Sequence, residues 1–373
     1  MRDKIRVGFI GCGGIAREKH MEAYRYHSAK SEMVAFCDTD FPRAQTLCDV
    51  YGARGAKAYA DHHEMLKDGT IDMVVVCTPN AMHAQNTIDA LEAGKHVMCE
   101  KPMAHSLAAA EAMVDSAKKC GKKLSISYQF RFREDSLAIK DFVEAGELGE
   151  IYYARAQAIR RRAVPTWGRF LSMDTQGGGA LIDYGTHALD LTLWLMNNYE
   201  VDSVSGVSFH KLGQLPKGMQ GNPNGSWDPA RFEVEDSAMG FIKMKNGATI
   251  LLESAWALNT LEYRPMVATL CGTKGGAVQN PGPWGPTTYT YAINKVIGNE
   301  LVTVSPNDFC EQSDLNQRID ESTVEAPRKE MDQWLDAIIK DTAPVVLPEQ
   351  ALTVTRILDA VYRSSNEGRP IYF

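Results

Sequence analysis

The sequence lacks long hydrophobic runs, an excess of positive charge, and any low-complexity or repeated segment. No apolar stretch in its 373 residues approaches the roughly 20 residues that a membrane-spanning helix needs. The formal net charge of −7 at pH 7 argues against a protein that binds nucleic acid through its phosphates. We therefore expect neither a membrane nor a nucleic-acid partner, and the chain is long enough for two globular domains.

Closely spaced cysteines are also missing. The eight cysteines are scattered, none forms a C-x-x-C pair, and no His/Cys cluster has the spacing of zinc ligands, so we expect no metal site. Several lie in apolar, strand-like runs, which is typical of small buried thiols in a reducing compartment. The first residues, MRDKIRVGF, enter a strand almost at once, which indicates no signal peptide and predicts a cytoplasmic protein.

What the sequence does contain is a glycine-rich turn after its first apolar strand. The strand at residues 5–10 runs into a G-x-G-x-x-A sequence made of Gly11, Cys12, Gly13, Gly14, Ile15 and Ala16. Gly11 permits a tight turn, Gly13 lets the backbone approach a pyrophosphate, and the small Ala16 lets a helix pack closely on the strand. The phosphates would lie on free N–H groups at the helix N-terminus. The turn therefore predicts a bound dinucleotide.

An acidic residue follows the second predicted strand at the distance that such a site requires. Asp38 ends the strand at residues 33–37, about 20 residues beyond the glycine turn. A carboxylate there accepts a hydrogen bond from a ribose 2′-hydroxyl and repels a 2′-phosphate, so NAD is favoured over NADP. A Rossmann-like domain that binds another ligand, or none, is the alternative.

Strand and helix patterns alternate through roughly the first 125 residues, as in a doubly wound parallel sheet. The predicted strands are continuous apolar runs at residues 5–10, 33–37, 73–77, 96–99 and 124–128. The predicted helices lie at residues 17–26, 42–51, 61–67, 81–93 and 106–120. The fold class is therefore α/β, with a dinucleotide-binding Rossmann domain at residues 1–126.

Strand-like segments dominate after about residue 149, with turn signals between them. They lie at residues 150–159, 201–210, 236–244, 248–255 and 266–271, with helical patterns at 179–196, 328–340 and 348–367. We predict an α+β domain at residues 127–373 with a large open, mostly antiparallel sheet that binds substrate. The closing helix at 348–367 would be able to pack back on the first domain. Loops at 213–227 and 280–286 are expected to shape substrate specificity.

Polar residues follow three of the predicted parallel strands, and ligands of doubly wound sheets bind at such strand ends. Thr78 and Asn80 are placed to contact a ribose, although plain turn chemistry explains them almost as well. Lys101, in an E-K-P sequence, could stabilise a developing alkoxide, with a solvated lysine as the alternative. Arg131 could hold substrate oxygen atoms or form an interdomain salt bridge.

The strongest catalytic candidates are Asp183 and His187, at positions i and i+4 of a predicted helix that follows three glycines. On one helix face, a carboxylate can fix the tautomer of an imidazole and stabilise its cation, which suits proton transfer near neutral pH. The glycines allow close approach of the backbone to a ligand. A structural pair on a half-buried helix is the alternative. Arg161, inside a run of three arginines, and Trp167 could bind an anionic or sugar substrate, or form a solvated strand end.

In their order and approximate spacing, the glycine turn, Asp38, the E-K-P sequence and the Asp183/His187 pair resemble one family. It is the glucose–fructose oxidoreductase / inositol dehydrogenase / MocA (Gfo/Idh/MocA) family, and the resemblance covers the whole chain. It implies NAD(P)-linked oxidation of a sugar or cyclitol hydroxyl, and a homodimer or homotetramer assembled through the C-terminal sheet. It also implies that Lys101 contacts the reacting hydroxyl, that His187 takes its proton, and that Asp183 holds the position of the base or of the substrate.

The expected site is the sum of these assignments. The residues expected to bind the cofactor, NAD rather than NADP, are Gly11, Cys12, Gly13, Gly14, Ile15, Ala16, Asp38, Thr78, Asn80, His83, Glu100, Lys101 and Gln129. Those expected to bind the sugar, polyol or glycoside are Lys101, Arg131, Arg161, Trp167, Asp183 and His187. The catalytic set is Lys101, Asp183 and His187.

Two other functions share this fold. An NAD-dependent redox glycosidase would oxidise a ring hydroxyl, eliminate the glycosidic oxygen and then restore the hydroxyl, with no net NADH formation. A non-catalytic NAD-binding sensor would bind the cofactor without turnover. The intact Lys101, Asp183 and His187 favour an enzyme over a sensor.

Overall fold

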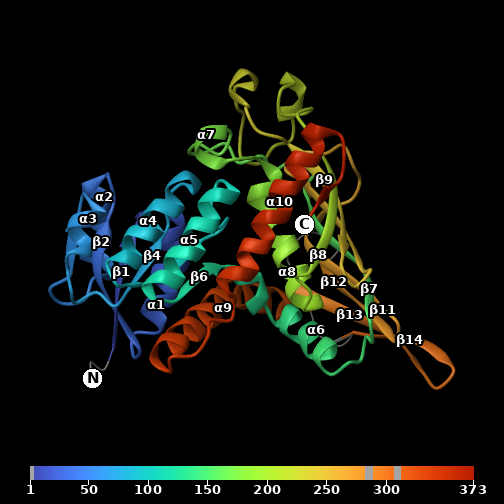
Figure 1. Ribbon diagram of the computed structural model, residues 1–373, viewed down its shortest axis with the longest axis horizontal. Helices are drawn as coiled ribbons and strands as arrows, with labels where there is room; N and C mark the ends of the chain where they lie inside the picture. The colour runs from blue at the N-terminus through green and yellow to red at the C-terminus, as the bar shows by residue number, and fades with distance from the viewer. Residues whose placement is uncertain (1–3, 282–288, 306–311) are drawn as a thin grey trace. The chain divides into compact units, whose positions relative to one another are not determined.

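The computed structural model describes residues 4–281, 289–305 and 312–373, which divide into two units (Figure 1). Unit 1 comprises Met1–Gln129 and Val324–Leu352, and unit 2 comprises Phe130–Thr323 and Thr353–Phe373. The units differ from the predicted ranges of 1–126 and 127–373 because one late segment joins unit 1. Met331, Trp334 and Leu335 of that segment are buried in the core beneath the first strands.

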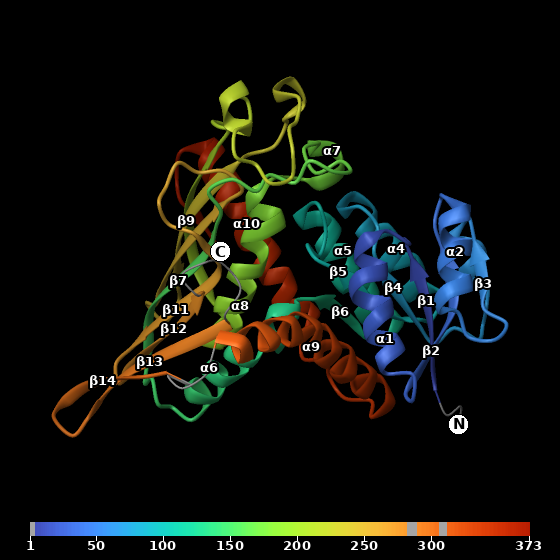
Figure 2. The ribbon, with the colours of Figure 1, turned by 180° about the vertical axis from the view of Figure 1, so that it is seen from behind.

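Unit 1 contains a six-stranded, entirely parallel sheet in the order β3-β2-β1-β4-β5-β6, which Figure 2 shows from β6 to β3. Its strands are β1 (Ile5–Ile10), β2 (Ser31–Cys37), β3 (Lys57–Tyr59), β4 (Met73–Val76), β5 (His96–Glu100) and β6 (Leu124–Ser127). The predicted parallel sheet is thereby confirmed. One strand of this sheet, β3, was not predicted. It is three residues long and lies at the edge of the sheet, where a strand can be short and does not need a continuous apolar run.

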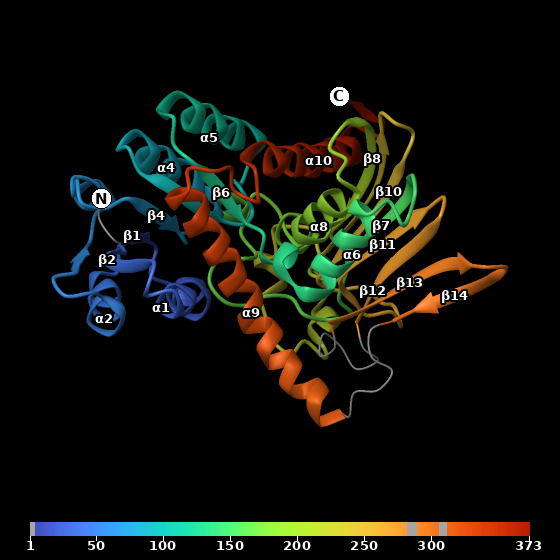
Figure 3. The ribbon, with the colours of Figure 1, turned by 90° about the horizontal axis from the view of Figure 1, so that it is seen from below.

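Helices cover both faces of this sheet, with α4 and α5 on one face and α1 and α2 on the other (Figure 3). They are η1 (Ala16–Met21, a π-helical turn), α1 (Glu22–Tyr26), α2 (Phe41–Tyr51), α3 (His62–Leu66), α4 (Asn80–Glu92) and α5 (Leu107–Cys120). Their ends follow local chemistry. Ser106 caps α5 by accepting a hydrogen bond from the amide of Ala109, and Gly121 ends it in the left-handed conformation.

Unit 2 contains a nine-stranded sheet in the order β14-β13-β12-β11-β7-β10-β9-β8-β15. Its neighbouring strands are antiparallel except for β7 and β10, so the predicted mostly antiparallel sheet is confirmed. The strands are β7 (Ile151–Ile159), β8 (Val201–Phe209), β9 (Ser237–Met244), β10 (Thr249–Ala255), β11 (Arg264–Gly272), β12 (Gly275–Pro281), β13 (Tyr289–Ile297), β14 (Glu300–Val304) and β15 (Ile371–Tyr372).

The helices of unit 2 gather on one face of this sheet, where α6, α8 and α10 lie in Figure 3. The helical segments are η2 (Gln129–Phe132), α6 (Glu134–Glu144), α7 (Met173–Gln176), η3 (Leu181–Gly185), α8 (Thr186–Met196), η4 (Pro216–Met219), η5 (Pro229–Arg231), α9 (Gln312–Ile339) and α10 (Pro348–Glu367). Units 1 and 2 share α9 and α10. The predicted loop at 213–227 contains η4, whereas the one predicted at 280–286 begins with the end of β12 and otherwise lies outside the described residues.

Across residues 4–281, 289–305 and 312–373, the structure holds no helix with the length and apolarity to cross a bilayer. The seven cysteines within these ranges are all free thiols, and Cys310 lies outside them.

Candidate active site

The glycine turn of unit 1 is built as the sequence predicts. Gly11 has φ +91°, and a Cβ atom there would lie 2.6 Å from the carbonyl oxygen of Cys77, so only glycine fits. No atom lies within 4 Å of the position that a Cβ of Gly13 would take. The backbone at Gly13 is therefore open to a ligand. Ala16, which follows it, is fully buried against the sheet and begins η1.

A pocket of about 510 Å³ opens beside this turn. It is lined by Cys12, Gly13, Gly14, Arg17, Arg43, Thr46 and Leu47. The two arginines supply positive charge next to the exposed backbone of the turn, and the next residue, Ile15, is also exposed. Open N–H groups with nearby cations suit a pyrophosphate, so the residues present fit a dinucleotide.

Asp38 lies at this turn. Its Oδ2 accepts a hydrogen bond from the amide of Cys12 at 2.9 Å, and its Oδ1 accepts one from the amide of Asp40 at 2.9 Å. The Arg43 guanidinium lies 3.5 Å from Oδ2. The structure thus brings Asp38, predicted to bind the ribose, next to the glycine turn, predicted to bind the pyrophosphate. Burial, reinforced by Asp38, raises the pKa of the Cys12 thiol to about 12, so Cys12 contributes its amide and not a reactive thiolate.

The loops after β4 and β5 are tied together by His83. Its Nδ1 lies 2.8 Å from the carbonyl oxygen of Pro102, and its Nε2 lies 2.8 Å from that of Thr78. The hydroxyl of Thr78 in turn accepts a hydrogen bond from Asn86 at 3.1 Å. His83 is buried and holds the backbone next to Lys101, so its visible role is to position the loop. Asn80 begins α4, directly after this turn.

A buried charge network lies directly beneath Lys101. Glu100 Oε1 accepts from Lys19 Nζ at 2.8 Å and lies 2.7 Å from His20 Nε2, while its Oε2 accepts from the amide of Lys101. Burial opposes the charge of Glu100, but Lys19 and His20 hold the pKa of its carboxyl well below its usual range. Glu100 therefore braces the strand end that carries the half-buried Lys101.

Glu330 of α9 joins the same network. Ser127 donates a hydrogen bond to Glu330 Oε2 at 2.9 Å, and Lys19 Nζ lies 3.7 Å from that oxygen. Lys19, His20 and Glu330 were not among the residues predicted from the sequence. Lys19 and His20 could have been found, because they lie between Ala16 and Ala23 on the buried face of the first helix. Polar residues stand there at positions where apolar residues are expected.

In unit 2, a buried glutamate caps the helix that carries Asp183 and His187. Glu235 accepts hydrogen bonds from the amides of Gly179 at 2.7 Å and Leu181 at 2.8 Å, and from the hydroxyl of Tyr362 at 2.9 Å. A Cβ on Gly179 would lie 2.0 Å from the carbonyl oxygen of Glu235. We expected the glycine run to let the backbone approach a ligand. These contacts correct that expectation, because the glycines instead make room for Glu235, which caps the helix. Neither Glu235 nor Tyr362 was identified from the sequence.

Asp183 and His187 occupy successive turns of this helix, which begins as the π-helical turn η3. Asp183 Oδ2 accepts a hydrogen bond from Trp256 Nε1 at 2.9 Å. The His187 ring packs edge-on against Phe130, with 4.8 Å between ring centroids, and is almost fully buried. Fixed aromatic partners therefore restrict the orientation of both predicted catalytic side chains. π-Helical turns are frequent at functional sites.

The remaining predicted substrate residues fall into different environments. Arg131 is fully buried, and its guanidinium donates to both oxygens of Asp190, so its position gives no support to a substrate contact. Arg161 is exposed. Trp167 lines a second pocket within unit 2. Gln129, predicted to bind the cofactor, opens η2 directly after β6.

One cluster of the described residues has metal-ligand chemistry. Asp61, His62 and His63 each place a possible ligand atom within 4.8 Å of the others. His62 Nε2 lies 2.8 Å from Asp89, and Asp61 accepts a hydrogen bond from the amide of His63 as the cap of α3. Hydrogen bonding and capping thus account for the arrangement, and we assign no metal to it.

Comparisons with known proteins agree with this geometry. A family model described as an oxidoreductase family with an NAD-binding Rossmann fold matches residues 5–128, and its C-terminal alpha/beta domain model matches residues 140–373. A D-glucoside 3-dehydrogenase of Escherichia coli (strain K12) is 35% identical over 364 residues, which are 98% of this chain and 96% of that protein.

Two further proteins extend the comparison. A 1,5-anhydro-D-fructose reductase of Ensifer adhaerens is 28% identical over 306 residues, or 82% of this chain and 85% of that protein. The crystal structure of an aldose-aldose oxidoreductase from Caulobacter crescentus, complexed with glycerol, superposes with a TM-score of 0.75 at 25% identity. That comparison covers 99% of this chain and 100% of the other.

Proposed function

We propose, from the premise that the chain belongs to the NAD-binding Gfo/Idh/MocA oxidoreductase family, that it oxidises a secondary hydroxyl of a sugar, inositol or glycoside. The observation that carries the proposal is the glycine turn of unit 1, where an open backbone at Gly13 adjoins the carboxylate of Asp38. Because that carboxylate accepts hydrogen bonds and repels a 2′-phosphate, we further propose NAD as the preferred cofactor over NADP.

The proposed chemistry uses the predicted catalytic set. When bound, NAD supplies the hydride acceptor. The Lys101 ammonium stabilises negative charge that develops on the reacting oxygen. His187, as a neutral imidazole, takes the hydroxyl proton as general base, and Asp183 orients that base or the substrate. Hydrogen bonding of Asp183 to Trp256 and packing of His187 on Phe130 support this assignment, since a proton acceptor must be held in position.

Among the possible substrates we favour a glucoside. The D-glucoside 3-dehydrogenase resembles this chain along nearly its full length, and unit 2 offers aromatic residues on which a sugar ring can stack. We also propose that the protein is cytoplasmic and acts as a homodimer or homotetramer.

The test is a turnover assay with purified protein. NAD or NADP is incubated with a panel of inositols, free sugars and glucosides, nicotinamide reduction is followed by absorbance, and products are identified by mass spectrometry. We expect NADH formation with a glucoside. Lys101→Ala and His187→Ala should each lower kcat by about 10²–10⁴, because each removes one group that acts on the reacting hydroxyl. NAD binding, measured by calorimetry, should persist in His187→Ala.

The exposed residues Lys119 and His210 provide matched controls, and Lys119→Ala and His210→Ala should retain activity. Glycoside cleavage without net NADH would show a redox glycosidase instead. A sensor would bind NAD tightly and form no product from any compound. Its NAD binding would be unchanged in Lys101→Ala and in His187→Ala.

A further inference from the structure

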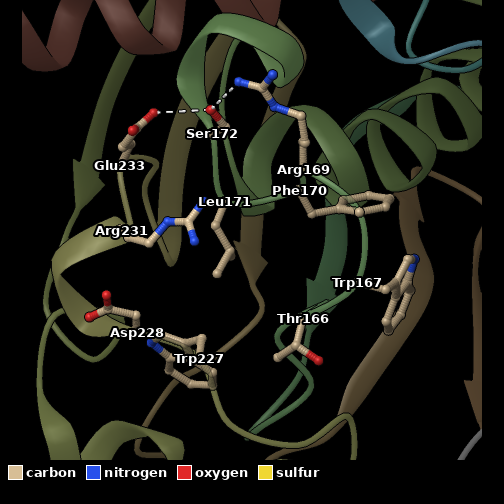
Figure 4. Close-up of a pocket in the computed structure, with 11 residues that line it drawn as sticks. Thr166, Trp167, Arg169, Phe170, Leu171, Ser172, Trp227, Asp228, Arg231 and Glu233 are labelled. Carbon is tan, nitrogen blue, oxygen red and sulfur yellow. Dashed lines mark hydrogen bonds between the residues drawn. The ribbon is translucent and has the colours of Figure 1, made fainter.

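A second pocket, of about 490 Å³, lies entirely within unit 2. Two segments form its walls, residues 166–172 after β7 and residues 227–233 before β9 (Figure 4). Trp167 is 57% exposed, and its indole packs edge-on against Phe170, with 5.7 Å between ring centroids. Trp227 is fixed, because its Nε1 donates to the carbonyl oxygen of Gly213 at 2.7 Å. The pocket thus presents aromatic surface on opposite sides.

The charged residues of this pocket differ in how they are used. Arg169 is paired with Asp174 at 2.9 Å, and Glu233 accepts from the amide of Met173 at 2.9 Å. The amide of Arg231 donates to the carbonyl oxygen of Asp228 at 3.0 Å, but its guanidinium has no ion-pair or hydrogen-bond partner within residues 4–281, 289–305 and 312–373 and points into the pocket in Figure 4. Asp228, on the same wall, uses Oδ1 to accept from the amide of Ala230. The pocket therefore contains a cationic fork available to a ligand.

Buried side chains link this pocket to the helix of the predicted catalytic pair, although neither member of that pair lines it. Trp227 is part of a buried cluster with Trp256, and Phe170 and Leu171 pack against the same cluster. Trp256 in turn donates to Asp183. In addition, Glu233 of the pocket wall is two residues from Glu235, which caps the helix that bears Asp183. These contacts join the wall of the pocket to the elements that hold Asp183.

We propose that this pocket binds the second ring of a glycoside, the group attached to the anomeric oxygen of the sugar that is oxidised. This inference rests on the proposed function and names its substrate class as disaccharides and related two-ring glucosides. The apolar face of a pyranose stacks on an indole such as Trp167. The Arg231 fork donates to neighbouring ring hydroxyls, and the Asp228 carboxylate accepts from one. A methyl glucoside has no group to fill this space.

The test compares two-ring with one-ring substrates. Specificity is expressed as the ratio of kcat/KM for cellobiose or maltose to kcat/KM for the methyl glucoside of the same anomer. We expect a ratio above one in the wild type and a fall of about tenfold or more in Trp167→Ala and in Arg231→Met, mainly through KM of the disaccharide. Tyr372→Ala and Arg369→Met are matched substitutions of exposed residues outside the pocket and should keep the wild-type ratio.

A binding measurement separates this inference from the proposed function. Calorimetry of cellobiose and maltose with the NADH-loaded protein reports on the pocket without turnover. If glucosides are oxidised but neither substitution changes the ratio, the pocket assignment is overturned and the dehydrogenase stands. If nothing is oxidised, yet a disaccharide binds the wild type and binds Trp167→Ala and Arg231→Met at least about tenfold more weakly, the pocket stands without the dehydrogenase. Absence of both turnover and disaccharide binding overturns both.

Discussion

At the scale of single residues, the glycine turn shows that neighbouring glycines can be required for different reasons. Gly11 has a positive φ and no room for a Cβ next to Cys77. Gly13 has neither constraint, since nothing lies within 4 Å of where its Cβ would be. The fold therefore requires glycine at position 11, whereas only a bound ligand would require it at position 13.

This distinction predicts different behaviour for two substitutions to alanine. Gly13→Ala should leave the melting temperature of the protein without NAD within about 2 °C of the wild type, because the added methyl group meets no protein atom. The same substitution should weaken NAD binding by about tenfold or more, because the methyl group occupies the approach of the pyrophosphate. Thermal unfolding and calorimetric titration with NAD provide the two measurements.

Gly69 is the matched control, since it is exposed and also has no atom within 4 Å of its Cβ position. Gly69→Ala should change neither quantity. Wild-type NAD affinity in Gly13→Ala would mean that the pyrophosphate does not approach this part of the turn.

At the scale of elements, long-range polar contacts fix the positions of two helices. Glu235 holds the start of the helix that carries Asp183, and Glu330 ties α9 to the end of β6 through Ser127. Burial of Glu330 raises the pKa of its carboxyl to about 7, although Lys19 opposes that shift. Glu330 Oε1 has no hydrogen-bond partner among the residues that the structure describes. Ionising Glu330 in the folded protein is therefore unfavourable.

The raised pKa of Glu330 predicts a pH dependence of stability. The folded protein binds this proton up to about pH 7, whereas the ordinary pKa of the carboxyl is 4.5, so the free energy of unfolding falls as pH rises between those values. The fall attributable to this group is on the order of 3 kcal/mol. Glu330→Gln cannot ionise, so it should lose less stability than the wild type between pH 5 and pH 8. Urea-induced unfolding across that range measures the difference.

Glu325 on the same helix serves as the control. Its carboxylate is half-buried and paired with Arg328 at 2.9 Å, and Glu325→Gln controls for the loss of one carboxylate from α9 outside the buried network. Equal pH profiles for Glu330→Gln and the wild type would contradict the proposed ionisation.

At the scale of the whole molecule, α6, α8 and α10 lie on one face of the sheet of unit 2, and the residues that the structure describes place no helix of this unit over the other face (Figure 3). Gly206 and Gly240 lie against Val361 of α10, and the next residues along these strands, Val207 and Phe241, point to the opposite face. Val207 is 45% exposed and Phe241 50% exposed. Apolar side chains on an uncovered sheet suit a contact between subunits, which is the assembly that the family resemblance implies.

This face predicts how the oligomer should respond to charge. We expect sedimentation velocity to show a dimer or tetramer, and Phe241→Glu to shift it toward the monomer, because association would desolvate the new carboxylate. Leu261, which is 92% exposed outside the strands, provides the control, and Leu261→Glu should sediment like the wild type. A monomeric wild type would exclude an interface on this face. An oligomer unaffected by Phe241→Glu would place the interface elsewhere.

Local patterns were sufficient for much of the fold. The apolar run of β1 and the helix α10 have the bounds that the sequence predicts, and the glycine turn lies between strand and helix as expected. Three strands near one edge of the second sheet, β12, β13 and β14, were not predicted, and neither was α6. β14 is mostly exposed, and its mixed residues give no continuous apolar run from which a strand could be predicted.

The sequence by itself determined the elements and the chemistry whose residues are close together in the chain. The glycine turn is of this kind, because the residues that predict it, Gly11, Gly13 and Ala16, follow an apolar strand within a few positions of one another. Only the tertiary structure decided the partners of buried charges. It pairs Arg131 with Asp190, joins Lys19 to Glu100 and Glu330, and places Trp256 against Asp183. These partners meet only when separate elements pack together, and burial then makes each unpaired charge costly.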